Sequence, residues 1–397
     1  MTDRAGAIVL GAGIAGTALA YHLQGRLDGP VVVIDPRTPA AGATGRAAGI
    51  VTEQMWDRWD FDVVRESRAE YAALAARHDP GAYRVNGFVR WTVRADIADA
   101  LRAAGARLRS WGAAIEELTP AALARRLPSV RVDDVVAVQS DPNDAVVGPS
   151  ALAEAYLADA RAHGADAVLG EASFRLRSDG EGWVFEGGGR AIRAPVAVVA
   201  AGAWSKRLLT ELGAPLPLAP YRTQAALLRP PAPDEARFPS AHDLDVDVYV
   251  RPEENGRILA GDGTRLVEVD PESAPLSGDD EFVTHVAETF ASRFPGWADA
   301  ELVRAWAGVC TSTPDRRPLI GPVPGRRGLF CLVGFNGFGV MRAGGAAGRL
   351  ADAIAAPDDG RARERLDPVR PDRFSPPFRP FDPRPGFTLE GGADPRF

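Results

Sequence analysis

Several residue types are scarce in this chain, and each shortage excludes a class of protein. The 397 residues contain two cysteines, Cys310 and Cys331, which cannot form a disulfide framework, so we expect a reducing, cytoplasmic compartment. The N-terminus lacks the order of a signal peptide, and no apolar run approaches a membrane span of about 20 residues. The formal net charge of −7 argues against a nucleic-acid partner. The five histidines show no metal-ligand spacing and no convincing general base, so we expect no metal site.

The N-terminal residues have the pattern of a dinucleotide-binding unit. A buried strand over residues 7–10 leads into a helix over residues 14–24, and the turn between them has G-x-G-x-x-G spacing, with Gly11, Gly13 and Gly16. These glycines permit a tight turn, close approach of the backbone to a pyrophosphate, and packing of the helix on the strand. A second buried strand, residues 31–34, ends at Asp35, whose carboxylate is placed to accept ribose hydroxyls.

The next stretch favours FAD over NAD. A simple NAD enzyme continues with another strand and helix, whereas residues 40–51, AAGATGRAAGIV, form a loop of small residues that includes Thr44 and Arg46. Such a loop can wrap the flavin and ribityl half of a long cofactor.

The chain is long for one core, so we expect two domains. Residues 196–202 and 329–341 repeat the pattern of strand, glycine and helix start, so the FAD-binding domain is discontinuous, with segments 1–85, 146–214 and 305–360. Alternating, strand-like stretches assign residues 86–145 and 215–304 to a second, largely antiparallel, substrate-facing domain. The tail, residues 361–397, is rich in Pro, Arg, Asp and Phe and is expected to form no regular elements.

Four blocks in this order resemble the D-amino-acid oxidase superfamily of FAD-dependent oxidoreductases, which includes sarcosine oxidases, glycine oxidases and D-amino-acid dehydrogenases. The blocks read VLGAGIAGTALAYHL, GATGRAAGIV, VVAAGAWS and TPDRRPLIGPV…GFNGFGVM. The resemblance implies an α/β fold with a glutathione-reductase-type FAD-binding Rossmann domain. It also implies a substrate domain built on a mixed, mostly antiparallel sheet.

The expected FAD-binding residues lie mostly in these blocks. They are Gly11, Gly13, Ile14, Ala15, Gly16, Asp35, Pro36, Arg37, Thr44, Gly45, Arg46, Ala47, Ala48, Gly49, Ser173, Ala200, Ala201, Gly202, Trp204, Gly308, Gly334, Phe335, Asn336, Gly337, Phe338, Gly339, Val340 and Met341. By resemblance, Gly308 matches the cysteine that carries the flavin in monomeric sarcosine oxidases, and Arg46 matches the corresponding histidine of the dimethylglycine and sarcosine dehydrogenases. Both attachment points are missing, so we expect FAD to be non-covalent.

Two familiar carboxylate clamps of the superfamily are also missing. Met341 stands where some sarcosine oxidases have a lysine, and Gly337 where glycine oxidases have an arginine. The remaining candidates for substrate contact are Tyr249, Arg251 and Arg342. Tyr249 falls where several relatives place a tyrosine over the flavin face. Because Arg251 follows it by two residues on an expected strand, both side chains should lie on one face, and Arg251 is our first choice as the clamp.

We therefore expect an enzyme that oxidises the C–N bond of an amino acid or secondary amine by hydride transfer to flavin N5, with O2 or another carrier as electron acceptor. Oxidation of the C–O bond of a 2-hydroxy acid is an alternative, disfavoured because it usually needs a histidine base. Further alternatives are a flavoprotein subunit or scaffold without its own activity, and an aromatic monooxygenase, which would have a GDAAH-like block where GFNGFGVM stands. Disulfide reductase chemistry needs a closely spaced cysteine pair, which is missing.

Overall fold

A six-stranded sheet forms the centre of the first domain. The computed structural model describes residues 3–231, 238–246, 248–262 and 267–378. The order of the sheet is β10-β3-β2-β14-β21-β20, and all neighbours pair in parallel except β20 with β21. Its strands are β2 (Ala7–Leu10), β3 (Val31–Asp35), β10 (Asp166–Leu169), β14 (Val196–Val199), β20 (Leu319–Pro322) and β21 (Leu329–Val333). Continuous apolar runs such as VVVI suit these strands because both faces of the sheet are covered.

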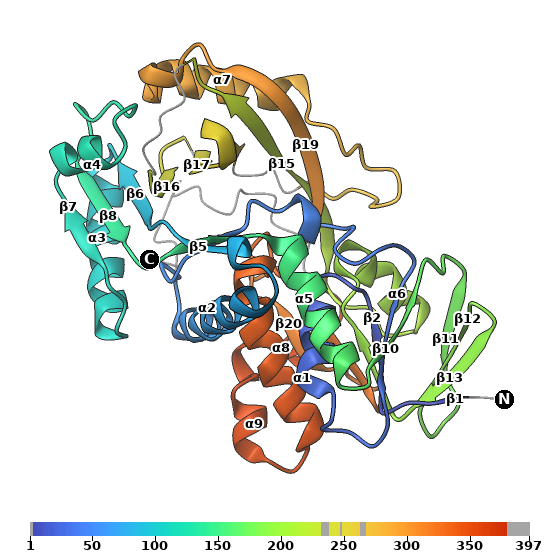
Figure 1. The fold of residues 1–397 in the computed structure, drawn as a ribbon. Coiled ribbons are helices and arrows are strands. Elements are labelled where there is room, and N and C mark those ends of the chain that lie inside the picture. The colour runs from blue at the N-terminus through green and yellow to red at the C-terminus, as the bar shows by residue number, and fades with distance from the viewer. Residues whose placement is uncertain (1–2, 232–237, 247, 263–266, 379–397) are drawn as a thin grey trace.

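Helices cover one face of this sheet, and a second sheet covers the other (Figure 1). The helical layer contains α1 (Ile14–Leu23), α2 (Arg58–His78), α5 (Pro149–Ala162) and α8 (Gly339–Ala355), which pack on Ala7, Val9, Val31 and Val33. The alternate side chains Ile8, Leu10, Val32 and Ile34 pack against a four-stranded sheet and α6 (Ser205–Glu211). That sheet has the order β1-β13-β12-β11, with β1 (Asp3–Arg4), β11 (Phe174–Ser178), β12 (Trp183–Gly187) and β13 (Arg190–Ala194).

The second domain is built on an eight-stranded sheet in the order β19-β15-β18-β17-β16-β6-β8-β7. All neighbours pair antiparallel except β16 with β6. The strands are β6 (Phe88–Thr92), β7 (Glu116–Leu118), β8 (Ala137–Asp141), β15 (Ala219–Arg229), β16 (Ser240–Asp243), β17 (Val248–Pro252), β18 (Ile258–Asp262) and β19 (Glu301–Ser312). Apolar side chains on one face, such as Val89, Val250 and Ala226, pack against α7 (Asp280–Arg293) and α4 (Pro120–Arg126). Alternation along the strands therefore leaves the other face free to line a site.

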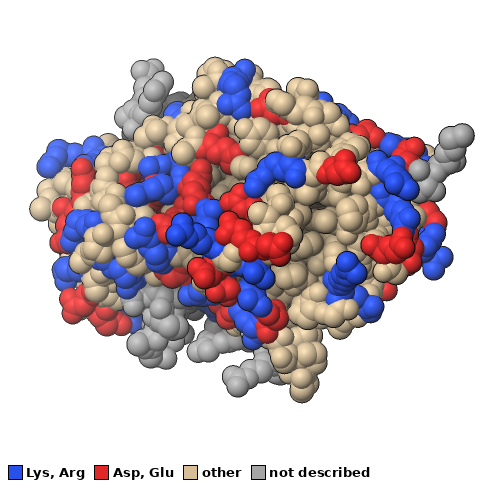
Figure 2. All heavy atoms as spheres, turned by 90° about the horizontal axis from the view of Figure 1, so that it is seen from below, with Lys and Arg blue, Asp and Glu red and all other residues tan. Residues whose placement is uncertain are grey.

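The remaining elements are short or peripheral. The helix α3 (Ala95–Ser110) packs beside β8, and a small sheet joins β4 (Ile50–Val51), β9 (Ala145–Val147) and β5 (Tyr83–Val85). Single 3₁₀ turns occur at Thr44–Arg46, Pro80–Ala82, Gly202–Trp204, Glu254–Gly256 and Pro295–Trp297. Figure 2 shows basic and acidic side chains intermixed on the face that it displays. Among the helices of the described ranges, none combines the length and apolar character of a membrane-crossing segment.

Two expectations about the domains need correction. The strand β19 pairs with β15 in the eight-stranded sheet as far as Ser312, which lies opposite Ala219, so this sheet continues past residue 304. The start of the tail does form regular elements, namely α9 (Gly360–Glu364) and 3₁₀ turns at Asp367–Val369 and Pro371–Arg373. Burial of Leu366 and Val369 and an ion pair between Arg373 and Asp315, 2.8 Å apart, hold this segment on the first domain. Residues 379–397 lie outside the described residues.

Candidate active site

A cavity of about 600 Å³ is lined by residues of both domains. One end is formed by the carboxyl ends of β2, β3 and β14 and the helices that follow, and the other by the face of the eight-stranded sheet that α7 does not cover. The crevice outside the carboxyl ends of parallel strands is the usual ligand site of such a sheet. Across the described ranges, no three His, Cys, Asp or Glu side chains gather into a metal-binding group.

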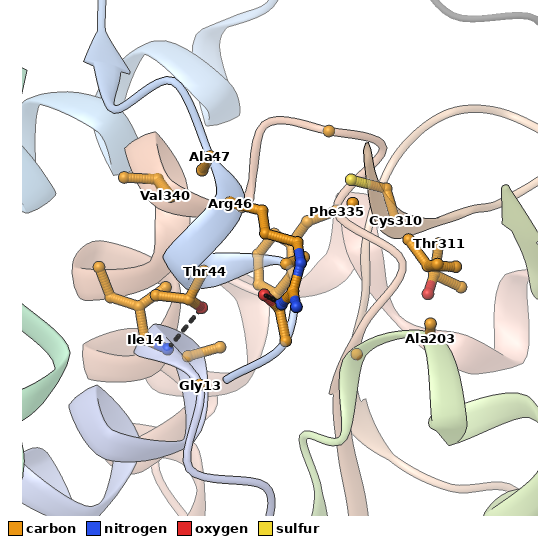
Figure 3. Close-up of a pocket in the computed structure, with 18 of the residues that line it drawn as sticks. Gly13, Ile14, Thr44, Arg46, Ala47, Ala203, Cys310, Thr311, Phe335 and Val340 are labelled. Carbon is orange, nitrogen blue, oxygen red and sulfur yellow. Dashed lines mark hydrogen bonds between the residues drawn. The ribbon is translucent and has the colours of Figure 1, made fainter. Parts of the chain in front are cut away.

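The first glycine-rich turn places the N-terminus of α1 at the cavity. Gly11 has a φ of 114°, and a Cβ there would overlap the carbonyl of Ala200 at the end of β14. The Oγ1 of Thr44 accepts a hydrogen bond of 3.1 Å from the N–H of Ile14 in the first turn of the helix (Figure 3). The small-residue loop is thereby tied to a helix terminus whose N–H groups favour phosphate.

Asp35 lies at the end of β3 and lines the same cavity. Its two carboxylate oxygens each accept a backbone N–H, from Ala12 and from Arg37, both at 2.8 Å. These bonds fix the orientation of the carboxylate and leave lone pairs for further donors such as ribose hydroxyls. The guanidinium of Arg37 lies over the ring of Trp204, 4.4 Å from its centroid, beside this position.

A second helix N-terminus reaches the cavity from the C-terminal part of the chain. The turn between β21 and α8 has positive φ angles at Gly334, Asn336 and Gly337. The amide of Asn336 fixes it, because the Oδ1 accepts the N–H of Thr313 at 3.1 Å and the Nδ2 donates to the carbonyl of Gly334 at 2.7 Å. The first residues of α8 therefore line the cavity, and the 17-residue helix directs its positive end toward it.

Arg46 adds a full positive charge between these helix ends. Its guanidinium donates to the carbonyls of Ala41 and Gly42, and Figure 3 shows it projecting toward Gly13 and Thr44. No acidic side chain of the described residues forms an ion pair with it. A cavity with two helix N-termini, a fixed arginine and a carboxylate at the end of β3 suits a long dinucleotide with a pyrophosphate and an adenosine ribose.

Most of the residues expected to bind FAD line this cavity. They are Gly11, Gly13, Ile14, Ala15, Asp35, Pro36, Arg37, Thr44, Arg46, Ala47, Ala48, Gly49, Ala200, Ala201, Gly202, Trp204, Gly308 and residues 334–341. Three do not. A Cβ at Gly16 would overlap the carbonyl of Gly11, which is the helix packing expected of this glycine, and Gly45 packs against the carbonyl of Ala40. Ser173 bonds through its N–H to Glu171, while its neighbours Ala172 and Phe174 line the cavity.

The eight-stranded sheet contributes a row of side chains that sequence reasoning missed except for Tyr249. Arg90 on β6 lies opposite His242 on β16, and His242 lies opposite Tyr249 on β17. Directly paired residues project from the same face of a sheet, and all three line the cavity. The same cross-strand register continues through Gly261 and Ala225 to Trp306 on β19.

Arg90 is the most distinctive member of this row. It is 7% exposed, donates to the carbonyl of Gln54 at 2.8 Å, and leaves its Nε without a hydrogen-bond partner. Burial lowers the pKa of its guanidinium to about 10, and the charge of Asp144 counteracts this decrease. The alternation in FVRWT, with a charged residue between apolar ones that face a core, was a signal for this position.

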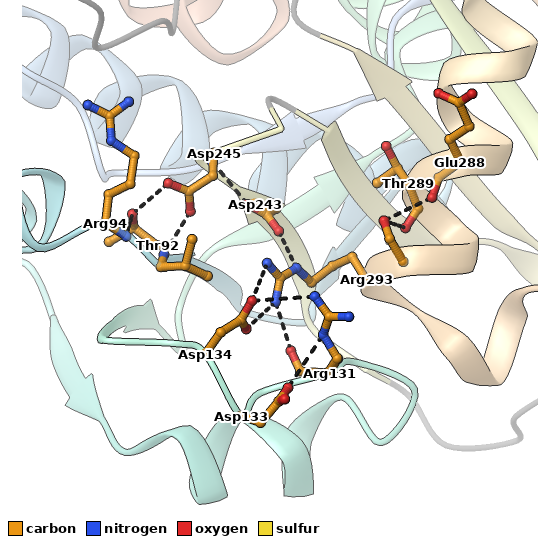
Figure 4. Close-up of polar contacts among 12 residues, drawn as sticks. Thr92, Arg94, Arg131, Asp133, Asp134, Asp243, Asp245, Glu288, Thr289 and Arg293 are labelled. Carbon is orange, nitrogen blue, oxygen red and sulfur yellow. Dashed lines mark hydrogen bonds and ion pairs between the residues drawn. The ribbon is translucent and has the colours of Figure 1, made fainter.

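His242 is held in place from the opposite face of its strand. Asp243, the next residue, is fully buried and pairs with Arg293 at the end of α7, 2.7 Å away, and Arg293 also pairs with Asp134 at 2.7 Å (Figure 4). Burial raises the pKa of the Asp243 carboxyl, and the charge of Arg293 counteracts the increase. This cluster ties β16 to α7 and to the loop before β8.

Two predicted substrate residues are placed elsewhere. Arg251 forms an ion pair with Glu253 and does not line the cavity, although it alternates with Tyr249 as expected. Arg342 is fully buried in α8, where it pairs with Asp60 and has its guanidinium carbon 5.1 Å from the ring centroid of Phe338. Phe338 lines the cavity and packs on Trp56, and the centroids of the two rings are 4.8 Å apart. Arg342 therefore packs behind an aromatic wall of the cavity and does not itself line the cavity.

Another corner of the cavity is closed by Tyr221 on β15. A Cβ at Gly337 would lie 3.1 Å from its hydroxyl oxygen, so this side chain fills the space beside the turn before α8. Cys310 lies opposite Tyr221 on β19 and lines the same corner (Figure 3). Burial raises the pKa of the Cys310 thiol to about 11, and a hydrogen bond with Tyr221 acts in the opposite direction.

The fold and the site together define a FAD-dependent oxidoreductase. The family described as DAO, FAD dependent oxidoreductase, matches residues 7–353, so the chain belongs to this family and is FAD-dependent. It is 27% identical over 350 residues to a glycine oxidase of Geobacillus kaustophilus, covering 86% of this chain and 90% of the relative. It is 26% identical over 403 residues to the mitochondrial dimethylglycine dehydrogenase of Homo sapiens, covering 93% of this chain but only 44% of that longer protein.

Solved structures show the same fold. The L-proline dehydrogenase from P. horikoshii matches with a TM-score of 0.83 and 21% identity over 91% of this chain and 96% of that one. The glycine oxidase structure from Geobacillus kaustophilus matches with a TM-score of 0.82 and 24% identity over 94% and 100%. The expected α/β fold, with a Rossmann domain and a mixed sheet domain, is confirmed, and the chain is an oxidoreductase.

Proposed function

We propose that this protein oxidises the C–N bond of an amino acid or secondary amine. The observation that supports this most directly is the row of Arg90, His242 and Tyr249 on a sheet face that lines the same cavity as the dinucleotide cradle. FAD held by the glycine-rich turns, Asp35 and Arg46 would supply a two-electron acceptor for hydride at N5. The C–H bond next to nitrogen breaks with its electron pair, the nitrogen lone pair forms the C=N bond, and water hydrolyses the imine. The amine and amino-acid names of the relatives agree with this reaction class.

Each side chain of this row has its own role in binding such a substrate. Arg90 binds the carboxylate, because a buried guanidinium that donates to a single carbonyl has donors left for a charge-assisted pair. The nitrogen must be neutral to give its lone pair to the C=N bond, and His242, which lines the cavity, would accept its proton. Tyr249 lies with its ring over Gly261, where a Cβ would overlap it, and covers the reacting carbon.

Oxidation of a 2-hydroxy acid is the second candidate function. The sequence alone shows no histidine base for this reaction, but His242 lines the cavity and could supply one. A hydroxyl is a weaker base than an amine and does not arrive protonated, so the same histidine would remove the hydroxyl proton.

Anaerobic reduction of the flavin distinguishes the two reactions. The FAD-loaded protein is mixed without oxygen with matched pairs that differ only in N or O, such as alanine and lactate or glycine and glycolate, together with sarcosine, dimethylglycine and both enantiomers of proline. We expect the oxidised flavin absorbance to disappear with amines and the carbonyl product to appear in equal amount. Reduction by hydroxy acids alone would replace the proposal with its alternative, and persistent yellow colour with every compound would remove both.

A further inference from the structure

A fully buried carboxylate lies behind Arg90 and has no part in the proposed reaction. Asp144 directly precedes β9, and the pairing of β9 with β4 brings it opposite Thr52. Its Oδ2 accepts the hydroxyl of Thr52 and, at 3.2 Å, the side-chain amide of Gln54, and its Oδ1 accepts the N–H of Glu53 at 2.8 Å. These three donors are neutral, so among the described residues they leave the charge of Asp144 without a paired cation.

Gln54 connects this carboxylate to Arg90. Its backbone carbonyl accepts the guanidinium of Arg90 at 2.8 Å, while its side-chain Nε2 donates to Asp144 and, at 3.0 Å, to the carbonyl of Phe88. Gln139, which lies directly opposite Arg90 on β8, donates to the Oε1 of the same amide at 3.0 Å. None of these five residues is more than 7% exposed. A single residue therefore separates the positive charge from the negative one, in surroundings where water screens them little.

The charged and titratable groups around Asp144 come from each element packed against it. They are Glu53 after β4, Arg65 and Arg68 on α2, Tyr83 on β5, Arg90 on β6 and Asp141 on β8. The two arginines of α2 pair with Glu53, at 2.9 and 2.7 Å, and balance its charge. Burial and the charge of Asp141 raise the pKa of the Asp144 carboxyl, so it titrates above the usual acidic range.

A carboxylate bound to Arg90 changes the balance of charge in this region. Before it binds, the charges of Arg90 and Asp144 offset each other. After it binds, one cation faces two buried carboxylates, and a proton on Asp144 restores the balance. The hydroxyl of Thr52 lines the cavity and donates to Asp144 Oδ2, so it can pass its proton to that oxygen and take another from solvent.

We propose that Asp144 is the internal counter-charge of Arg90, positions it through Gln54, and takes up a proton when a carboxylate binds to Arg90. This inference rests on the proposed role of Arg90 in binding the substrate. Asp144 does not line the cavity, so it is a positioning residue. Because the liganded protein then holds more protons than the unliganded one, affinity for a carboxylate falls as pH rises through the pKa of Asp144.

Binding of an unreactive carboxylate tests the inference without turnover. (Methylthio)acetate keeps the carboxylate of an amino acid and has sulfur in place of nitrogen. It is titrated into the FAD-loaded protein between pH 7 and 9, by calorimetry in buffers of different ionisation enthalpy. We expect uptake of up to about one proton per carboxylate and an affinity that falls by up to about 10-fold per pH unit. Burial lowers the pKa of Arg90 only to about 10, which lies above this range. A constant affinity without proton uptake would overturn the inference.

Variants assign the proton. Asp144→Asn should bind (methylthio)acetate without proton uptake and with an affinity that does not change between pH 7 and 9. Thr52→Val removes an O–H donor that favours the ionised carboxylate, so the fall in affinity should move to higher pH. Asp62→Asn, which loses an acid that pairs with Arg58 at the surface, is the control and should behave as the unmodified protein.

Two results would assign the proton elsewhere. Proton uptake that persists in Asp144→Asn and disappears in His242→Gln would place it on His242 and overturn the inference. If Asp144→Asn does not fold, Thr52→Val decides, because a merely structural Asp144 would leave the pH profile where it is.

The outcome is separable from that of the proposed function. If Arg90→Met binds (methylthio)acetate as tightly as the unmodified protein, Arg90 does not hold the carboxylate and the inference falls with that assignment. If amines reduce the flavin but no proton is taken up on binding, C–N oxidation stands and the role of Asp144 is wrong. If protons are taken up as expected and no amine reduces the flavin, the coupling stands and the reaction is a different one.

Discussion

The guanidinium of Arg342 lies 2.8 Å from the carboxylate of Asp60, and neither side chain is more than 1% exposed. Removing one partner leaves a charge buried without its counter-charge. We expect Arg342→Met to lower the free energy of unfolding by about 3–5 kcal/mol, measured by urea denaturation. Arg58→Met, which breaks the exposed and solvent-screened pair with Asp62, should lower it far less. Equal losses of unfolding free energy in the two variants would show that the buried pair contributes no more to stability than the exposed pair.

The same pair makes stability depend on pH. Burial raises the pKa of the Asp60 carboxyl to about 6, and the charge of Arg342 only partly counteracts this. A folded-state pKa above the ordinary value means that the folded state holds the proton more tightly, so this group lowers stability as pH rises from about 4 to about 6. We expect Asp60→Asn to remove that decrease, of at most about 3 kcal/mol. Parallel stability curves for the variant and the unmodified protein between pH 4 and 7 would contradict it.

We predict that FAD is held without a covalent bond. The positions that match the attachment residues of relatives are Gly308 and Arg46, which lie side by side, since a Cβ at Gly308 would be 3.4 Å from that of Arg46. Acid precipitation should leave the yellow colour in the supernatant. Colour in the pellet, followed by mass spectrometry of the peptide that contains Cys310, would reveal a bond through the thiol in the next cavity-facing position of β19.

Asp35 should contribute to FAD affinity through the ribose hydroxyls. Asp35→Ala is expected to weaken FAD binding by about 1.5–3 kcal/mol, the range for hydrogen bonds to a charged group, measured by quenching of flavin fluorescence. Because Asp35 also accepts the N–H of Ala12, the control is Asp35→Asn, whose amide oxygen keeps one acceptor for that turn. If the FAD dissociation constant is the same in Asp35→Ala as in the unmodified protein, Asp35 does not bind FAD and only stabilises the local turn.

Arg90 and Arg251 should differ in their effect on the substrate. Arg90→Met is expected to raise KM by about 10- to 100-fold because a charge-assisted pair is lost. Arg251 pairs with Glu253 outside the cavity, so Arg251→Met should change KM by less than about threefold. If Arg251→Met had the larger effect, Arg251 would reach the substrate from the face of β17 that it shares with Tyr249, in spite of its ion pair with Glu253.

The FAD half of the site was predictable because its residues follow one another along the chain. The glycines, Asp35 and the loop with Thr44 lie within the first 50 residues, and local geometry alone brings them together. The fold class followed from the same runs of buried strand and helix. Ser173 was the exception, since alternation along the chain before β11 gave no reason to prefer it over Ala172 and Phe174.

The substrate half depended on register, which the sequence did not supply. Arg90, His242 and Tyr249 come from three strands, and the pairing of β6 with β16 is parallel within an otherwise antiparallel sheet. An antiparallel assumption would not have placed Arg90 beside His242. Arg251 was placed on the correct face by alternation, but its position near the end of β17 lets it pair with Glu253.

The central sheet is assembled from strands that lie far apart in the sequence and are therefore synthesised at different times. The innermost strand β2 finds its two neighbours in β3 and in β14, and β14 in turn needs β21, which is followed by α8. A nascent chain that ends at residue 328 therefore has the N-terminus of α1 at the FAD site but lacks that of α8. We therefore expect FAD to bind only after α8 has formed, and a chain truncated before α8 to leave the apolar side chains of α1 and α2 without their packing partner.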